Sequence, residues 1–495
     1  MFLPLILSAV LASPSPSPSP LPESTPKKNL SVTIPMPKFI TPDEKLKFDI
    51  PYQIPELNWG NQRFWDPYQR QRDNTKNWID SDYATLNWFG LRDVLSTNGL
   101  DISVTYTADL AGNPVGGKSA GFTYCDNFTV DLEFQSKPLF GYEGGTLSII
   151  GLDRNGNNLT AQHIGNQFTV QQVYGGTGFI FYCLAYNQRF LDDKVSFKFG
   201  RMSAGDDFAS SPFYWLYMNN GIDGNPQSLP VNNKFSTYPW GVWGARLRAL
   251  TTPDTEAMLG IYQVSSQVSQ SYLHGFDWEM NGGDGVMLIA QYGWAPEFFK
   301  PSAPSPQQDG KSVTDGKSLS SHAADAIPHG LPGHYWMGGY YSTYSYPQWQ
   351  NSTQTQNGSY SLYWHFDQML YRMDPYKDTG LSAWSAFMLT PQQNTAKMPF
   401  QYNGGLVYTG LIPARPRDLS IFGVAYGNFS DNYATANQTA LGGNASYELA
   451  WEGGYRINLT KFAYVQPDLQ WIINPGGTGT IPNALVLGAQ IGVTF

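Results

Sequence analysis

The sequence predicts an all-β fold: a transmembrane antiparallel β-barrel of about sixteen strands, preceded by a short helix and a proline-rich leader. Three observations predict it. Residues 485–495 alternate between apolar and small or polar side chains, and many earlier segments do the same. Charged residues make up only 14% of the chain, and no apolar run approaches the ~20 residues that a spanning helix needs. The connections between the alternating segments are short at one end and long at the other.

The closing segment shows the alternation most clearly. One face carries Leu485, Leu487, Ala489, Ile491, Val493 and Phe495, and the other carries Val486, Gly488, Gln490, Gly492 and Thr494. Period-two alternation places one face of a strand in apolar surroundings. The segment is long enough for one crossing of an outer-membrane barrel, and lipid is expected to cover its apolar face. On this segment alone, the last strand of a soluble sandwich is the alternative.

Composition favours one barrel over two or three soluble domains. The 495-residue chain has 15% aromatic residues and 50 glycines, yet its mean hydropathy is −0.34. A wall that alternates between lipid and a polar, mostly uncharged interior has this composition. The net charge of −9 comes with no basic stripe to meet phosphates, so we expect no nucleic-acid partner.

The first 74 residues are expected to lie outside the barrel. Residues 1–12 are typical of a secretion signal, because 2–12 are mostly apolar and a small-residue cleavage site follows, although the first lysine is Lys27. Residues 13–74 are rich in proline, which favours an extended periplasmic spacer. Contact with peptidoglycan or a partner is the alternative to a plain tail. The barrel and its helix then occupy residues 75–495.

One helix is predicted just before the barrel. Ser81 or Asp82 provides the N-cap, and Gly99 provides the C-terminal stop. The apolar positions between them are Leu86, Leu91 and Leu95. Such a helix is expected at or inside the periplasmic mouth of the barrel.

Alternation sorts the later side chains into two faces. Charges fall almost entirely on the second face, which is therefore predicted to line the lumen: Asp109, Asp131, Glu133, Arg246, Arg248, Asp367, Glu448, Glu452 and Arg456. In the segment near residue 180, the predicted outward set is Ile180, Tyr182, Leu184 and Tyr186. Polar side chains also face water in a soluble sandwich, so the number and length of the segments decide in favour of a barrel.

The connections alternate in length. Residues 142–145 and 191–194 look like tight turns, whereas 153–178, 202–238 and 295–332 are long and rich in Gly, Pro, Ser and Asn. Outer-membrane barrels have short periplasmic turns and long external loops. All three long connections are therefore expected on the outside.

Several short motifs resemble those of one family. They are Gly-Arg-Met-Ser-Ala-Gly-Asp-Asp-Phe-Ala-Ser-Ser-Pro at 200–212, Trp-Phe-Gly-Leu-Arg at 88–92, Ala-Gly-Asn-Pro at 111–114, Asn-Asn-Gly-Ile at 219–222, Trp-Gly-Ala-Arg-Leu-Arg at 243–248 and Pro-Asn-Ala at 482–484. In this order, they resemble the carbohydrate-selective porins of the OprB type, over roughly residues 75–495. The leader and the long hydrophilic stretch 301–330 depart from the family core.

The resemblance implies a sixteen-stranded bacterial outer-membrane barrel that passes glucose and related sugars by facilitated diffusion. It implies neither an enzyme nor a cofactor. A sugar-selective pore needs hydrogen-bond donors and acceptors that replace water, and flat aromatic rings along which a sugar can slide. Arginine adds a rigid fork of donors that suits paired hydroxyls.

These requirements select the candidate channel residues. Arg246 and Arg248 are the expected constriction residues. Asp131 and Glu133 are expected among their partners, and the full candidate set is Asp109, Asp131, Glu133, Arg201, Asp206, Asp207, Trp215, Trp240, Trp243, Arg246 and Arg248. For each charge the alternative is a structural or solvated ion pair. For each tryptophan it is a place in the aromatic belt at the membrane interface.

Part of this set belongs to a loop. Arg201, Asp206 and Asp207 begin the 202–238 connection, which is expected to fold inward and narrow the bore. Trp215, Trp240 and Trp243 are candidates for a stacking path. The six histidines are scattered, and only the loop residues His329 and His334 stand at zinc-ligand spacing, so no metal is predicted.

Other functions remain open at this stage. A general small-solute porin, a lipid-hydrolysing barrel and a structural barrel or adhesin are the alternatives to a sugar porin. His365 falls on the face that is predicted to line the lumen, which disfavours a hydrolase site on the outer wall. Cys125 and Cys183 are expected to stay free thiols, because one strand should lie between theirs.

Overall fold

The structure is a computed structural model that describes residues 78–300 and 329–495. The predicted signal peptide at 1–12 and the spacer at 13–74 lie outside the described residues. So does most of the long hydrophilic stretch after β9.

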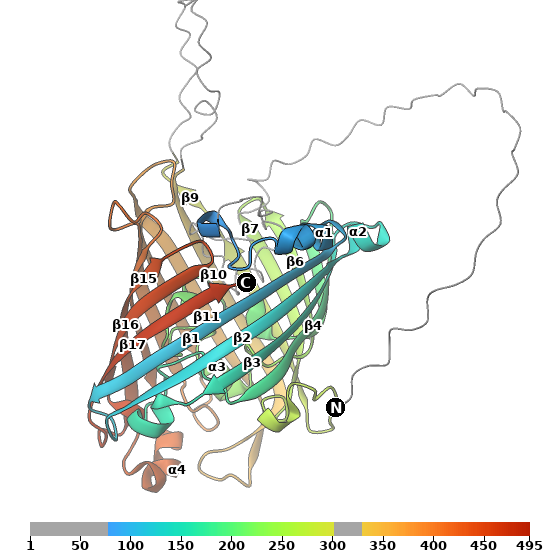
Figure 1. The fold of residues 1–495 in the computed structure, drawn as a ribbon. Coiled ribbons are helices and arrows are strands. Elements are labelled where there is room, and N and C mark those ends of the chain that lie inside the picture. The colour runs from blue at the N-terminus through green and yellow to red at the C-terminus, as the bar shows by residue number, and fades with distance from the viewer. Residues whose placement is uncertain (1–77, 301–328) are drawn as a thin grey trace, which may run out of the picture. The chain divides into compact units, whose positions relative to one another are not determined.

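Sixteen long strands form a closed wall, as the sequence predicts. Each wall strand pairs antiparallel with its neighbours, and β1 pairs with β17 to close the barrel (Figure 1). The two-residue strand β9 pairs with the start of β10 and adds no span. Among the described residues, no helix has the length and apolar character needed to span a bilayer.

The bounds of the strands follow the predicted segments. They are β1 (Leu100–Val115), β2 (Gly121–Gln135), β3 (Gly145–Gly156), β4 (Gly178–Phe190), β5 (Val195–Met202), β6 (Val242–Thr252), β7 (Thr255–Val264), β8 (Gly285–Trp294), β9 (Glu297–Phe298), β10 (Leu331–Pro347), β11 (Thr355–Arg372), β12 (Gly380–Leu389), β13 (Phe400–Thr409), β14 (Leu419–Asn428), β15 (Tyr447–Asn458), β16 (Ala463–Ile473) and β17 (Ala484–Thr494). The α-helices are α1 (Leu91–Thr97), α2 (Ser136–Phe140), α3 (Ser228–Asn233) and α4 (Asp431–Leu441).

The two faces of the strands differ in exposure as the alternation predicts. Along β8 every second residue is exposed, including Val286, Leu288 and Tyr292, while Met287 and Gln291 between them are buried. The exposed apolar set meets lipid and the other set meets the interior.

Strand β4 departs from the predicted faces. Cys183 pairs with Ile150 and Phe181 pairs with Gly151, so Tyr182 is an extra residue in the ladder. A bulge of this kind reverses the phase of a strand. Ile180 and Tyr182 are therefore buried and the prediction that they face outward is wrong, while Phe179 is exposed on the outer side.

The order of the strands also separates the two cysteines. Cys125 lies on β2 and Cys183 on β4, with β3 between them, as predicted. Both are buried free thiols.

The N-terminal helix is shorter than predicted. It comprises only Leu91–Thr97 and follows a single 3₁₀ turn at Trp88–Gly90. Phe89 and Gly90 have φ values of 58° and 94°, which no α-helix continues through. Arg92 then fixes the helix to the barrel seam, because its guanidinium donates to the carbonyl oxygens of Ile102 (2.6 Å) and Phe495 (3.1 Å).

The connections correct one prediction. Helices α1 and α2 and the C-terminus lie at one end of the barrel, and α4 lies at the other (Figure 1). The short turns at 191–194 and 253–254 join strands at the α1 end, which we therefore assign to the periplasm. The connection from β8 to β10 leaves and re-enters the wall at this same end. The prediction that the connection 295–332 begins and ends on the outside is therefore wrong for its described residues, 295–300 and 329–332, and residues 301–328 lie outside the described residues.

Two external connections, 157–177 and 203–241, fold into the barrel and are held by wall side chains. Both Oε atoms of Glu448 accept from backbone N–H groups of the first connection, at 2.7–2.9 Å. Glu452 accepts from the N–H groups of Met218 (2.6 Å) and Asn219 (2.9 Å). Gln466 and Gln470 donate to carbonyl oxygens of the two connections. The lumen is therefore largely filled on the β15–β16 side.

Candidate functional site

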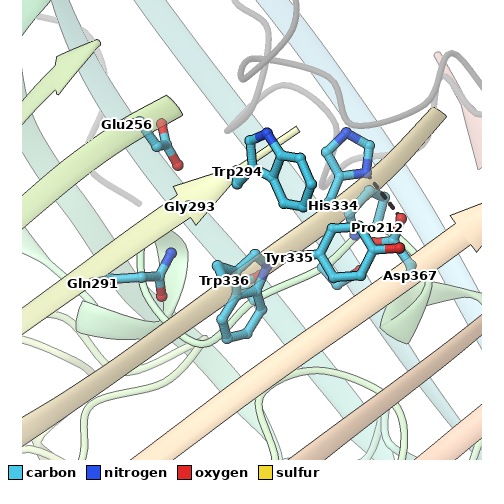
Figure 2. A pocket seen from close by; sticks show the side chains of 11 residues that line it. Pro212, Glu256, Gln291, Gly293, Trp294, His334, Tyr335, Trp336 and Asp367 are labelled. Atoms are coloured by element: carbon cyan, nitrogen blue, oxygen red, sulfur yellow. Dashed lines mark hydrogen bonds and ion pairs between the residues drawn. The ribbon is translucent and has the colours of Figure 1, made fainter. Parts of the chain in front are cut away.

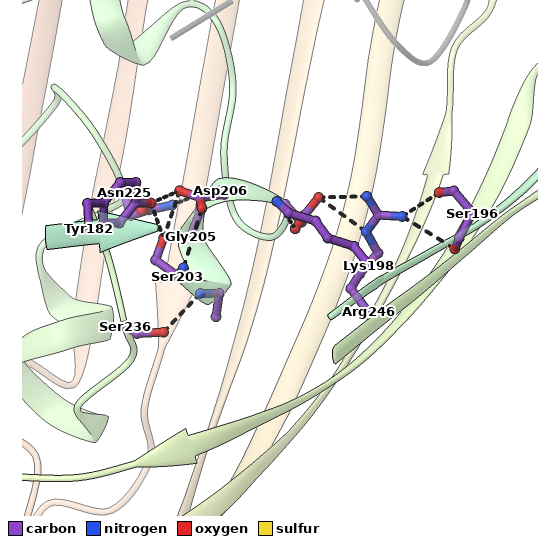
Figure 3. Close-up of polar contacts among 11 residues, drawn as sticks. Tyr182, Ser196, Lys198, Ser203, Gly205, Asp206, Asn225, Ser236 and Arg246 are labelled. Carbon is purple, nitrogen blue, oxygen red and sulfur yellow. Dashed lines mark hydrogen bonds and ion pairs between the residues drawn. The ribbon is translucent and has the colours of Figure 1, made fainter. Parts of the chain in front are cut away.

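The inward connection 203–241 begins with a rigid turn. Ser203 and Asp206 form a capping box around the single turn Ala204–Asp206, and the Tyr182 hydroxyl donates to the Asp206 carboxylate (Figure 3). The Asn225 side chain donates to the carbonyl oxygen of Gly205 in the same turn and to that of Ala209 just after it. This turn fixes the direction of the next residue, Asp207.

Asp207 joins the connection to the wall. Its carboxylate lies 3.1 Å from Lys198 Nζ on β5 and 3.0 Å from Arg246 Nη2 on β6. Arg246 also donates to Ser196 (Figure 3). Burial by itself raises the pKa of Asp207, but the Arg246 guanidinium and the Lys198 ammonium outweigh it and hold the pKa at about 2. Asp207 is therefore a carboxylate at neutral pH.

A second charge pair lies beside the first. Arg248 Nε donates to Glu256 Oε2 on β7 at 2.6 Å. The side chain of Arg248 is 20% exposed and that of Glu256 is 11% exposed, so both reach solvent inside the barrel. Lys198 pairs in register with Arg246 across the β5–β6 ladder, so both charge pairs occupy one part of the inner wall.

A small polar cavity continues this part of the wall toward β11. Its volume is about 30 Å³, which is enough room for a water molecule. Glu256, Gln291, His334, Trp336 and Asp367 line it from the strands, and Ser210–Pro212 line it from the connection (Figure 2). The row from β5 to β11 thus offers donors, acceptors and one indole ring to the interior.

A second fixing point lies at the end of this row. Asp367 accepts from His334 Nδ1 at 2.9 Å and contacts His365 Nε2 at 2.8 Å. His365 Nδ1 contacts the hydroxyl of Tyr214 in the inward connection at 2.8 Å. The connection is therefore held at β11 by the linked side chains Tyr214, His365 and Asp367, as well as by Asp207 at β5 and β6.

A larger hollow opens at the periplasmic end. Its volume is about 650 Å³, and Asp101, Gln135 and Arg189 are among its lining residues. These side chains come from the inner faces of β1, β2 and β4. This hollow is therefore much larger than the cavity beside the inward connection.

The structure brings only some of the predicted residues together. Arg246, Arg248 and Asp207 share the row described above, although the partners of Arg246 are Asp207 and Ser196 rather than Asp131 or Glu133. Asp131 and Glu133 do face the interior of β2, but they are 1% and 4% exposed. Asp109 is fully buried and accepts from Gln490 at 3.0 Å.

Two predicted residues lie on the outer side of the wall. Arg201 and Trp243 share the outward parity of Phe197 and Leu247. Trp243 Nε1 donates to the carbonyl oxygen of Trp278 in loop 265–284 at 2.8 Å. The stacking path predicted through Trp243 and the lumen position predicted for Arg201 are therefore wrong, because both side chains point away from the channel.

The remaining predicted residues belong to the inward connection. Asp206 supports its first turn, and Trp215 and Trp240 are partly buried within it. Glu256, Gln291, His334 and Trp336 were not among the predicted site residues. The alternation along 255–264 and 285–294 carried a signal for the first two, since each is the polar residue on an otherwise apolar inner face.

The comparisons with known proteins agree with this architecture. A family model described as carbohydrate-selective porin, OprB family, matches residues 119–495. The chain belongs to this family. Porin B of Pseudomonas aeruginosa is 25% identical over 439 residues, which cover 84% of this chain and 92% of Porin B.

Solved structures show the same fold. The high-pH structure of Pseudomonas putida OprB matches with a TM-score of 0.74 and 24% identity, over 85% of this chain and 100% of that one. The low-pH structure matches with a TM-score of 0.53 and 20% identity, over 84% and 99%. This OprB-family protein is thus a carbohydrate-selective porin of the outer membrane, a channel and not an enzyme. The predicted fold, family and location are confirmed.

Proposed function

We propose that this porin passes glucose-like sugars by facilitated passive diffusion through a constriction between the start of the inward connection and strands β5–β7. The constriction residues are Lys198, Asp207, Arg246, Arg248 and Glu256. The observation that carries the proposal is a row of paired charges, in which Asp207 lies between Arg246 and Lys198, and Arg248 lies beside Glu256. Three cations face two carboxylates, so five charged groups leave a net charge of only +1.

Compensated charges suit a neutral solute. A single-sign ring attracts ions, whereas paired charges leave little net field and still present strong donors and acceptors. The guanidinium groups supply forked donors, and the carboxylates supply acceptors that match adjacent hydroxyls. Binding stays weak because the solute competes with partners that the charges already have.

The test is single-channel conductance of the refolded porin in a planar bilayer, with glucose titrated in. We expect saturable blockade by glucose in the wild type. In Arg246→Ala/Arg248→Ala, we expect the half-blocking concentration to rise roughly tenfold, which corresponds to about 1.4 kcal/mol.

Arg415→Ala is the matched control. Arg415 is 41% exposed in a periplasmic connection and pairs with Asp418, away from the constriction. Glucose should block the Arg415→Ala channel at the same concentration as the wild type. Open current that no sugar reduces would leave a general small-solute porin, and equal blockade in the double variant would remove the assigned residues from the constriction.

A further inference from the structure

An arginine is buried on the outer side of the barrel wall. Arg201 is the second-to-last residue of β5 and lies on the same outward face as Phe197 and Phe199, which are exposed, yet Arg201 is only 1% exposed. A guanidinium that faces lipid without partners is strongly unfavourable. Something other than lipid therefore covers it.

The cover is loop 265–284, here called the outer strap. Arg201 donates to the carbonyl oxygens of Gly275 (3.4 Å) and Asp277 in the strap. Its guanidinium also lies 5.9 Å from the ring of Trp278. The strap thus runs over the outside of the wall rather than into the water beyond it.

The strap fills a gap in the wall. Pairing of β4 with β5 stops at Leu184 and Arg201, because the chain then leaves the wall to form the inward connection. Between this pair and the external end of β4, the edge of β4 lacks its β5 partner. An unpaired strand edge is costly in a membrane. The strap supplies the partner, since the N–H of Phe181 donates to the carbonyl oxygen of His274 at 2.8 Å.

Aromatic packing reinforces this contact. Phe276 stacks on Phe181 with ring centroids 5.3 Å apart. Trp278 packs edge-on against Trp243 at 6.1 Å. Gly275 has a φ of +79°, and a Cβ there would lie 2.1 Å from the carbonyl oxygen of Phe181, so this close approach requires glycine.

Arg201 connects the strap to both ends of the inward connection. It immediately precedes Met202 and the capping turn that aims Asp207. Its Nη2 also donates to the carbonyl oxygen of Gly241, where the connection returns to β6, at 2.8 Å. One side chain outside the wall thus ties together the two points where the connection passes inward.

We propose that Arg201 is a positioning residue for the constriction, which it holds in place from outside the barrel through the outer strap. The role in sugar passage rests on the proposed function above. Removing the hydrogen bonds of Arg201, or shifting the strap, should let the first residues of the inward connection move. Asp207 should then form its ion pairs with Lys198 and Arg246 in a smaller fraction of the molecules.

The experiment compares Arg201→Gln, Arg201→Lys and Gly275→Ala in planar bilayers. Folding is checked first by the heat-dependent gel mobility of the barrel. In Arg201→Gln and Gly275→Ala we expect greater open-channel current noise in plain salt, and a half-blocking glucose concentration raised roughly threefold to tenfold, tenfold being about 1.4 kcal/mol. Arg201→Lys, which keeps a donor, should recover part of both effects.

Tyr272→Ala is the matched strap control. Tyr272 is 68% exposed on the strap and is not a contact of Arg201, so this variant should behave as the wild type. Gly275→Ala moves the strap without touching the arginine, which keeps the test valid if Arg201→Gln fails to fold.

The outcomes separate the two proposals. Folded Arg201→Gln and Gly275→Ala channels with wild-type noise and wild-type blockade would overturn the positioning role. If Gly275→Ala fails to fold, the positioning role is overturned as well, because the strap is then needed to form the barrel. A wild type that glucose never blocks would overturn the proposed function, while the noise in salt would still decide the role of Arg201.

Discussion

Two parts of the inner wall use charged side chains in different ways. On β15, Glu448 and Glu452 are at most 1% exposed and accept hydrogen bonds from backbone N–H groups of the inward connections. On β5–β7, the charged groups pair with other side chains, and Arg248 keeps 20% of its side chain exposed. The same alternation places both sets inside the barrel.

The difference lies in the partner. A carboxylate that satisfies buried backbone groups cannot be exchanged for solute without leaving those groups unpaired. A side-chain ion pair that stays partly exposed, such as Arg248 with Glu256, can open and close at a lower cost, since exposed pairs contribute little to stability. The first set therefore fixes the connections, and the second set is the one that we propose to meet sugar.

The largest effect is expected from Glu448→Ala. This change leaves the N–H groups of Gln167, Phe168 and Gly476 without their acceptor. Buried unpaired donors cost about 1–3 kcal/mol each, so we expect the free energy of unfolding to fall by about 3 kcal/mol or more. Urea unfolding followed by gel mobility measures this. Glu448→Gln keeps one acceptor oxygen and should lose less; an unchanged midpoint in the alanine variant would contradict the fixing role.

The next effect tests the other side of the comparison. Asp207→Asn leaves Lys198 and Arg246 without their shared carboxylate. The constriction then gains net positive charge, so we expect the reversal potential in a salt gradient to shift toward anion selectivity. Unfolding should change much less than in Glu448→Ala. A shift toward cations, or none, would place Asp207 outside the ion path.

A smaller effect is expected from pH. The pKa of Asp207 lies at about 2, below its ordinary value of 3.8. Because the folded pKa is depressed, the contribution of the carboxylate to stability is complete above about pH 4 and is lost as pH falls through about 2. Ion selectivity should therefore stay constant from pH 7 to about 4 and change below that. Asp207→Asn should lack this transition, and a transition centred above pH 5 would assign it to another group.

The smallest effect is expected at the periplasmic surface. Lys137 and Glu143 form an ion pair in which the two side chains are 69% and 77% exposed. Exposed pairs of this kind contribute little to stability. Lys137→Ala should change neither the urea midpoint nor the glucose blockade, which makes it the baseline for the three variants above.

The sequence was sufficient for the fold because alternation is a local property. The outward and inward faces of β8 and β17 can be assigned residue by residue, and the strand count follows from the segments. The bulge at Tyr182 was missed because one extra residue in a ladder leaves no mark in composition. The end of the barrel at which β8 ends and β10 begins was also missed, although counting strand directions from α1 assigns it.

The site was predicted less well, for a physical reason. Parity identifies an inward charge but not its partner, and partners such as Asp207 for Arg246 lie on a connection whose path no periodicity describes. The outward positions of Arg201 and Trp243 could have been assigned from alternation, since they share the faces of Phe197 and Leu247. The strap that covers them could not, because its contacts are recognised only in three dimensions. Family resemblance supplied the function that the pattern alone left open.

Part of the inward connection is held through its main chain. Glu452 binds the N–H groups of two successive residues, and Gln401 and Asn403 donate to the carbonyl oxygen of Gly221. Main-chain groups are the same whatever side chain a position carries. The scaffold can therefore accept new residues at the partly exposed positions of this connection, such as Trp215 and Gln227, without moving it. Such a design separates the choice of solute from the stability of the pore, so that either can change in evolution or engineering while the other is kept.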